Sequence, residues 1–254
     1  MITKKYSEIP ARNFILTIII LAIIASWIYL FNQTHNMMGF SMGLTMGMKT
    51  IPFLIMWTIM MIAMMFPAVF PMVASFGLVY ISRHQNGKPT VPIWVFLTGY
   101  LVVWTLFGLV AYWGALSLSW IAKIFPQSQN YAPVTIGILF IITGIYQVTP
   151  FKNACLGKCR SPMEFIRTSW RDGYKGALIM GFVHGLYCLG CCWLLFILIF
   201  PLGIMNITAM GILTLIIFAE KTFSWGQKLN KPSAIILFGI GIAIILFPRI
   251  LNIF

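Results

Sequence analysis

The sequence predicts an all-α fold, a polytopic bundle of about seven transmembrane helices with the N-terminus on the inner side of the membrane. Hydrophobic residues make up 60% of the 254 residues and charged residues only 8%, whereas a soluble globular domain carries about 25% charged residues. A soluble fold has too little interior for this much apolar surface, so the composition favours lipid as the solvent.

The basic residues account for a formal net charge of +13. In a soluble protein this charge would indicate nucleic-acid binding. Here the Lys and Arg residues lie in short segments between apolar runs, where they act as topology signals and contact anionic lipid headgroups. We therefore expect the lipid bilayer, and no nucleic acid, as a partner.

Long apolar runs set the number of helices, because a transmembrane helix needs roughly 20 mostly apolar residues. The runs that qualify are 14–31, 52–80, 92–121, 132–148, 176–200, 203–220 and 233–251. The first run lacks a clear small-residue cleavage site and is expected to be retained as a helix. We expect one membrane domain over 1–254, with an inner loop at 149–175 that carries a short interfacial helix near 162–171.

The distribution of Lys and Arg gives the orientation. With these runs as crossings and the N-terminus inside, 14 of the 17 Lys and Arg residues fall on the inner side. Such a bias is a strong positive-inside signal. It predicts a multi-pass protein of the cytoplasmic membrane with a cytoplasmic N-terminus.

The cysteines form two clusters, one in the inner loop and one in the fifth predicted helix. Cys155 and Cys159 form a C-x3-C pair in the loop. His184, Cys188 and Cys191 lie within about 60° of one another around a helix, with Cys192 just beyond them. A single buried Cys is ordinarily a small hydrophobic side chain. An imidazole beside several thiols inside a membrane is better explained as a metal site, because such a group is costly without a partner.

Small residues lie beside this stripe of possible ligands. Gly181 and Gly185 form a G-x-x-x-G pair. Such pairs let a neighbouring helix approach closely. We therefore expect ligands from two helices to meet here.

Methionine is the second soft ligand in the sequence, which has 16 of them. Met60 and Met64 share one face of the second predicted helix and are assigned as ligands, with Met61, Met65 and Glu220 as outer supporting residues. Pro67 and Pro71 predict a kink beside them. A proposed outer metal-capture loop holds His35, Met37, Met38, Met42, Met46 and Met48. The alternative is that Met fills gaps in the core.

Thioether and thiolate ligands together select Cu(I), while imidazole also suits zinc. The soft ligands order into a route from the outer loop, through Met60 and Met64, to the His184–Cys192 stripe and finally to Cys155 and Cys159. Copper is therefore the expected metal, with zinc, or haem held by His184 and an axial Met or Cys, as open alternatives. Glu220 is either a carboxylate near the metal or the partner of a local ion pair with Lys221.

Longer motifs carry a family resemblance. They are Met60–Pro67, Gly144–Pro150, Cys155–Pro162, Met180–Trp193, Gly203–Asn206 and Glu220–Lys221. On these stretches the sequence resembles the prokaryotic family of predicted metal-binding integral membrane proteins. The resemblance implies metal binding and supplies no reaction.

The leading functional hypothesis is binding, transfer or delivery of Cu(I) to a membrane copper enzyme or another copper-accepting protein. The alternatives are a metal- or thiol-dependent membrane oxidoreductase and an accessory subunit of a larger membrane complex. No P-loop, Rossmann glycine fingerprint or H-E-x-x-H helix occurs. No catalytic constellation is identified.

Overall fold

The computed structural model describes residues 8–37, 44–87, 91–125 and 131–248. Within these ranges the regular structure is entirely helical, which confirms the predicted all-α fold. The longer helices are α2 (Glu8–Met37), α3 (Thr50–Gln85), α4 (Ile93–Ile124), α5 (Ala132–Gln147), α8 (Gly173–Ile197), α10 (Ile207–Thr222) and α11 (Asn230–Leu246). The shorter ones are α6 (Pro150–Arg160), α7 (Pro162–Ser169), α9 (Ile199–Leu202) and the 3-10 helix η2 (Gly226–Leu229).

Fewer helices are long enough to cross a membrane than the sequence suggested. Within the described residues, five spans are long and apolar enough, and they are Leu16–Thr34, Thr50–Arg83, Ile93–Ile124, Gly173–Leu202 and Gly226–Leu246. The pair α5 and α6 makes a sixth if its 62° bend is part of one span. Helix α10 has only 16 residues, short of the roughly 20 that a full crossing needs.

The late start of α10 accounts for one of the missing spans. The apolar run begins at 203, but Gly203 adopts φ 93° and breaks the helix there, a conformation that glycine tolerates best. Asn206 then caps α10, because its side-chain oxygen accepts a hydrogen bond from the Ala209 backbone N–H. Residues 203–206 are therefore a turn, although they are apolar enough to extend the run.

The segment expected as an inner loop at 149–175 is largely helical. Thr149 caps α6 by accepting from the backbone N–H of Lys152, and Pro150 occupies the first turn, where its missing N–H costs nothing. The interfacial helix expected near 162–171 corresponds to α7. The loop prediction is therefore wrong for residues 150–160, which form α6 and carry Cys155 and Cys159. The Thr149 cap and Pro150 are the sequence features that indicate the start of this helix.

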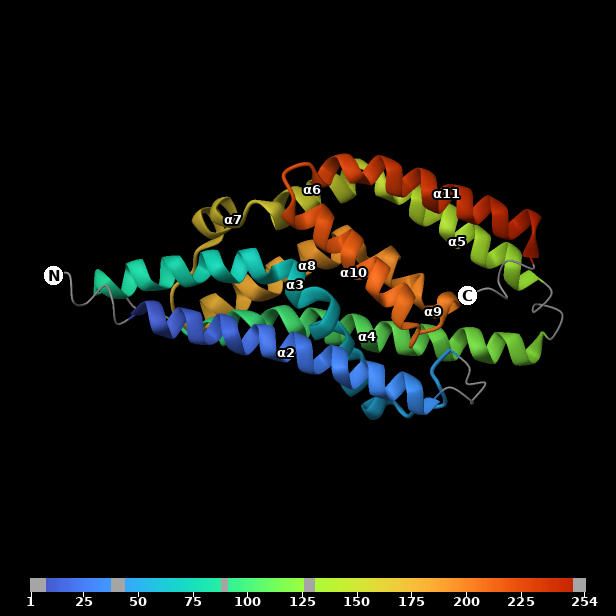
Figure 1. Ribbon diagram of the computed structural model, residues 1–254, viewed down its shortest axis with the longest axis horizontal. Helices are drawn as coiled ribbons and strands as arrows, with labels where there is room; N and C mark the ends of the chain where they lie inside the picture. Colours follow the sequence, from blue (N-terminus) through green and yellow to red (C-terminus); the bar gives the residue numbers. More distant parts are fainter. Residues whose placement is uncertain (1–7, 38–43, 88–90, 126–130, 249–254) are drawn as a thin grey trace.

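Two close helix pairs organise the bundle, α4 with α8 and α5 with α11. Figure 1 shows α5 and α11 lying together along one side, with α10 between them and α3. A Cβ atom on Gly181 would overlap the backbone carbonyl of Phe96. The close approach predicted at Gly181 and Gly185 therefore occurs, and the approaching helix is α4.

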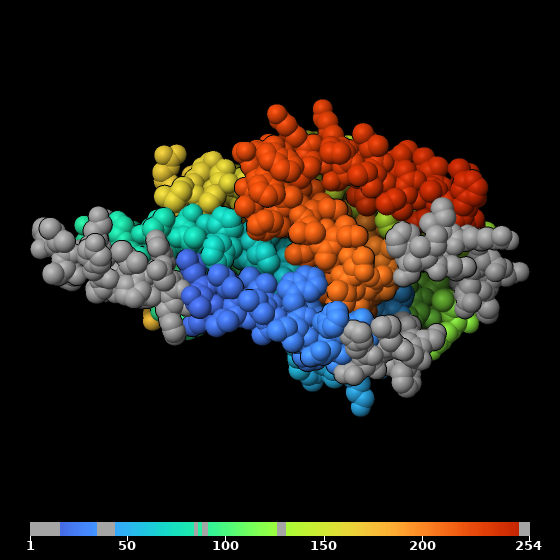
Figure 2. Space-filling model, in the orientation of Figure 1, coloured from blue at the N-terminus to red at the C-terminus, as the bar shows by residue number. Residues whose placement is uncertain are grey.

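Helix α3 contains both predicted prolines, Pro67 and Pro71, and it changes direction midway along its length in Figure 1. Proline removes one ladder hydrogen bond and crowds the preceding turn, which bends a helix. Before the bend, Met60, Met61, Met64 and Met65 are completely buried. Figure 2 shows α2, α10 and α11 sharing one face of the molecule.

Candidate metal centre

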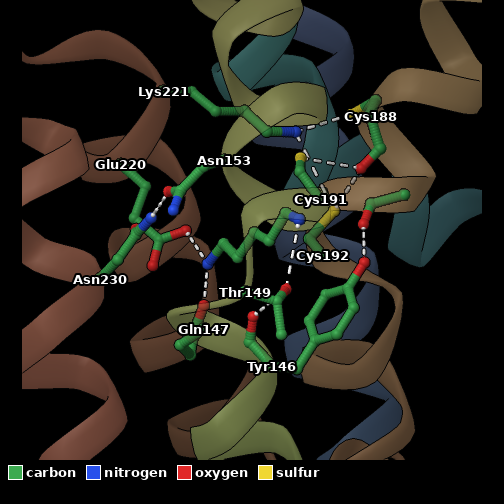
Figure 3. Close-up of polar contacts among 12 residues, drawn as sticks. Tyr146, Gln147, Thr149, Asn153, Cys188, Cys191, Cys192, Glu220, Lys221 and Asn230 are labelled. Atoms are coloured by element: carbon green, nitrogen blue, oxygen red, sulfur yellow. Dashed lines mark hydrogen bonds and ion pairs between the residues drawn. The ribbon is translucent and has the colours of Figure 1, made fainter.

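The cysteines of α8 form the middle of the site. Cys188, Cys191 and Cys192 are each only 2% exposed. The Cys191 and Cys192 Sγ atoms lie 3.0 and 2.8 Å from the backbone carbonyl oxygen of Cys188, to which their thiols donate (Figure 3). These contacts fold the three side chains around the same turn of α8.

Cys188 connects α8 to three other helices. Its Sγ lies 2.9 Å from Tyr100 Oη on α4 and 2.7 Å from Lys221 Nζ on α10. The Met65 Sδ of α3 lies 4.0 Å from the same sulfur. Cys188 therefore stands where α3, α4, α8 and α10 meet.

Helix α6 brings the other two cysteines to the same place. The Cys159 thiol interacts with the thiols of Cys188 and Cys191. Cys155 packs on α8 at Gly190, where an added Cβ would lie 2.9 Å from its Sγ. The Tyr146 hydroxyl also holds this turn of α8 by donating to the Gly190 carbonyl. The sequence predicted that Cys155 and Cys159 lie in the inner loop, at the end of the metal route and apart from the cysteines of α8. The bend between α5 and α6 instead folds them against α8.

His184 lies one helical turn before Cys188, in an aromatic environment. Its ring centroid is 5.8 Å from that of Phe96, 6.0 Å from that of Tyr100 and 5.1 Å from that of Phe165. The side chain is buried, and within the described ranges its Nδ1 atom has no hydrogen-bond partner. The imidazole therefore keeps a free nitrogen beside the cysteine cluster.

Among the described contacts, Met65 is the methionine whose sulfur reaches a cysteine. The sequence assigned Met60 and Met64 as ligands and Met65 to an outer position. Adjacent residues of a helix point about 100° apart, so Met65, which reaches Cys188, and Met64, which is also completely buried, point in different directions from α3. Which methionine reaches the cysteines depends on the rotation of α3 about its own axis, which is set by its packing.

The outer capture loop is described only in part. Met38 and Met42 lie outside the described residues, as do the side chains of His35 and Met37. Met46 is buried in the core and Met48 packs against it. Met46 and Met48 therefore have packing partners, as the core-filling alternative predicts.

A second buried polar cluster lies next to the thiols. Lys152 Nζ of α6 is 2.8 Å from Glu220 Oε2 of α10, and both side chains are almost fully buried. Lys152 also donates to the side-chain oxygen of Gln147. Glu220 thus pairs with Lys152, and Lys221 points to the cysteines (Figure 3). The local Glu220–Lys221 ion pair considered from the sequence does not form.

Sequence reasoning missed Lys221 and Tyr100 as parts of the site. A lysine at the end of an apolar helix is ordinarily an interfacial anchor, and its neighbour Glu220 offered an obvious partner. The buried position of Lys221 shows otherwise. For Tyr100 the sequence carries no comparable signal.

The described residues contain no group of three or more His, Cys, Asp or Glu side chains arranged to hold a metal ion. The ammonium group of Lys221 lies among the thiols instead, 2.7 Å from Cys188 Sγ and 4.0 Å from Cys192 Sγ. The donor set consists of thiols and a thioether, which are ligands for soft cations. The site is therefore a sulfur cluster that already contains a positive charge.

Fold and site together define a class of protein: an apolar helical bundle with sulfur-bearing side chains buried in its core. A comparison with protein families connects the chain to copper. A family model described as "Copper chaperone" (PpoB2) matches residues 54–244, which run from α3 into α11. The chain belongs to this family of copper chaperones. No curated protein and no solved structure matches it.

Proposed function

We propose that this protein is a membrane copper chaperone that binds Cu(I) in the sulfur cluster and passes it to a copper-accepting protein. The observation that carries the proposal is the meeting of sulfur atoms from separate helices. Cys188 Sγ lies 4.0 Å from Met65 Sδ, and Cys159 interacts with the thiols of Cys188 and Cys191. Thiolate and thioether ligands favour Cu(I) over harder cations.

Cys188 is the proposed central ligand, with Cys159, Cys191 and Met65 completing the sulfur set. Cys192 lies on the same turn and serves as a further thiol. His184 is a candidate additional nitrogen ligand, since its Nδ1 has no hydrogen-bond partner among the residues that the structure describes. We assign Glu220 a structural role and not a role in metal binding, because its carboxylate already pairs with Lys152.

A gradient of exposure supports transfer through α6. Cys188 is buried, whereas Cys159 is half-buried. Copper passing from Cys188 to Cys159 would move toward the surface, where an acceptor's ligands can reach it. In this proposal the long apolar helices span the cytoplasmic membrane with the N-terminus inside, and residues 35–48 supply the metal from the outer side.

The test is the copper content of purified protein in detergent after anaerobic loading with Cu(I). Native protein is expected to retain copper after desalting, and the Cys188→Ser/Cys191→Ser/Cys192→Ser variant is expected to lose it. Met163→Leu, a change at an exposed methionine of α7, is the matched control and should keep native copper content. Native protein with no more copper than the triple variant would contradict the proposal.

A further inference from the structure

The Lys221 side chain places a fixed positive charge inside the sulfur cluster. Lys221 is 7% exposed, and its Nζ lies 2.7 Å from Cys188 Sγ and 4.0 Å from Cys192 Sγ. In the part of the chain that the structure describes, Lys221 forms no salt bridge with a carboxylate. Figure 3 shows the ammonium group directed at the cysteines of α8.

The backbone of α10 enforces this arrangement. Adjacent helical residues point about 100° apart, so Glu220 reaches α6 and Lys221 reaches α8. Glu220 is already used by Lys152 at 2.8 Å and does not neutralise Lys221. A buried ammonium without a counter-charge is strongly destabilising. The sulfur atoms are therefore the groups positioned to balance the charge of Lys221.

The charge of Lys221 acts differently on monovalent and divalent metals. Cu(I) bound by two thiolates forms a group with a net charge of minus one, which the ammonium neutralises. Zn(II) bound by the same two thiolates is neutral, and the ammonium then leaves one uncompensated positive charge. For any number of thiolates, the divalent ion adds one more positive charge beside the ammonium. Such charges interact strongly in a buried, poorly solvated site.

We propose that Lys221 is a specificity-determining residue that makes the cluster select a soft monovalent cation over a divalent one. This inference rests on the proposed function, since it concerns the same sulfur site. An ammonium group carries donors only and no acceptor, so Lys221 is not a ligand. It acts through the sulfur atoms and is a positioning residue.

Tyr100 helps to hold the sulfur atom of Cys188 in place. Its hydroxyl lies 2.9 Å from Cys188 Sγ, and the residue is completely buried on α4. Cys188 Sγ is thus fixed from α4 by a neutral hydroxyl and from α10 by a charged ammonium. The hydroxyl carries no net charge, so discrimination by charge is assigned to Lys221 alone.

The experiment measures two affinities in the full-length protein in detergent, one for Cu(I) by competition with a chromophoric chelator and one for Zn(II). Lys221→Met removes the charge at similar length. It should shift the ratio of the two affinities toward Zn(II) by roughly tenfold or more. Lys221→Arg keeps the charge and should preserve the native preference. If the Met variant does not fold, Lys221→Gln provides the same comparison.

A matched control removes the other buried lysine. The Lys152→Met/Glu220→Gln variant deletes an ion pair that does not touch the sulfur atoms and should leave the ratio of the two affinities unchanged. Cu(I) and Zn(II) affinities that fall in parallel in Lys221→Met would indicate a structural role and overturn the inference. An unchanged ratio of Cu(I) to Zn(II) affinity in Lys221→Met would also overturn it. Native protein that binds no Cu(I) would instead refute the proposed function itself.

Discussion

Glu220 and Lys221 are adjacent on α10, yet they pair with partners on different helices and not with each other. Glu220 Oε2 lies 2.8 Å from Lys152 Nζ on α6, and Lys221 Nζ lies 2.7 Å from Cys188 Sγ on α8. One turn of α10 therefore connects to the second polar cluster and to the sulfur site. Movement of α10 relative to α6 and α8 would disturb both contacts together.

The ion pair between Lys152 and Glu220 should contribute strongly to folding. Lys152→Met leaves the Glu220 carboxylate buried without its partner and should lower stability by about 3–5 kcal/mol. The double variant Lys152→Met/Glu220→Gln removes the unpaired charge and should recover most of the loss. Thermal unfolding in detergent measures both. A single variant as stable as native protein would contradict the ion pair as described.

Cys159 should matter more for copper than Cys155. The Cys159 thiol interacts with both Cys188 and Cys191, whereas Cys155 packs on the backbone at Gly190. We expect Cys159→Ser to weaken Cu(I) binding by roughly tenfold, as loss of one soft ligand implies. Cys155→Ser serves as the matched variant in a chelator competition. A larger loss in Cys155→Ser would reverse the assignment within α6.

Met65 should act through its sulfur atom. Met65→Leu keeps the volume and should cost less than about 1.5 kcal/mol of stability, while lowering Cu(I) affinity. Met72→Leu, a change at another buried methionine of α3, should leave Cu(I) affinity at the native value. The comparison uses Cu(I) competition alongside thermal unfolding. Equal affinities in the two variants would remove Met65 from the proposed ligands.

The contact between α4 and α8 should depend on Gly181. A Cβ there would overlap the Phe96 carbonyl, so Gly181→Val should separate the helices and greatly reduce the yield of folded protein. Gly211→Ala on α10 is the control, because no atom lies within 4 Å of an added Cβ. It should be neutral or slightly stabilising. Size-exclusion profiles and unfolding temperatures report the result, and a normally folded Gly181→Val protein would contradict the packing.

The helices were largely predictable from hydropathy, because an apolar run must form a helix when it is surrounded by apolar material. The start of α10 was not, since Gly203 and Asn206 act through backbone conformation and capping, which hydropathy does not measure. Helix α6 is polar enough to look like a loop, and its cap at Thr149 is a local signal.

The cysteines of the candidate site could be singled out from the sequence, but their neighbours on other helices could not. The spacing of Cys188, Cys191 and Cys192 predicted that they share one side of a helix, and all three are buried on α8. Helical spacing has no information about which neighbouring helix faces that side. The contacts to Lys221, Met65 and Cys159 depend on the bend before α6 and on the phase of α3 and α10, so they emerge only in three dimensions.

The most direct test of the central claim is the X-ray absorption spectrum of copper in protein loaded with Cu(I). The account predicts an edge typical of Cu(I) and a coordination shell dominated by sulfur, with scattering that weakens in Cys188→Ser. A shell of nitrogen and oxygen alone, unchanged by that substitution, would contradict the proposal that the sulfur cluster of α3, α6 and α8 binds copper.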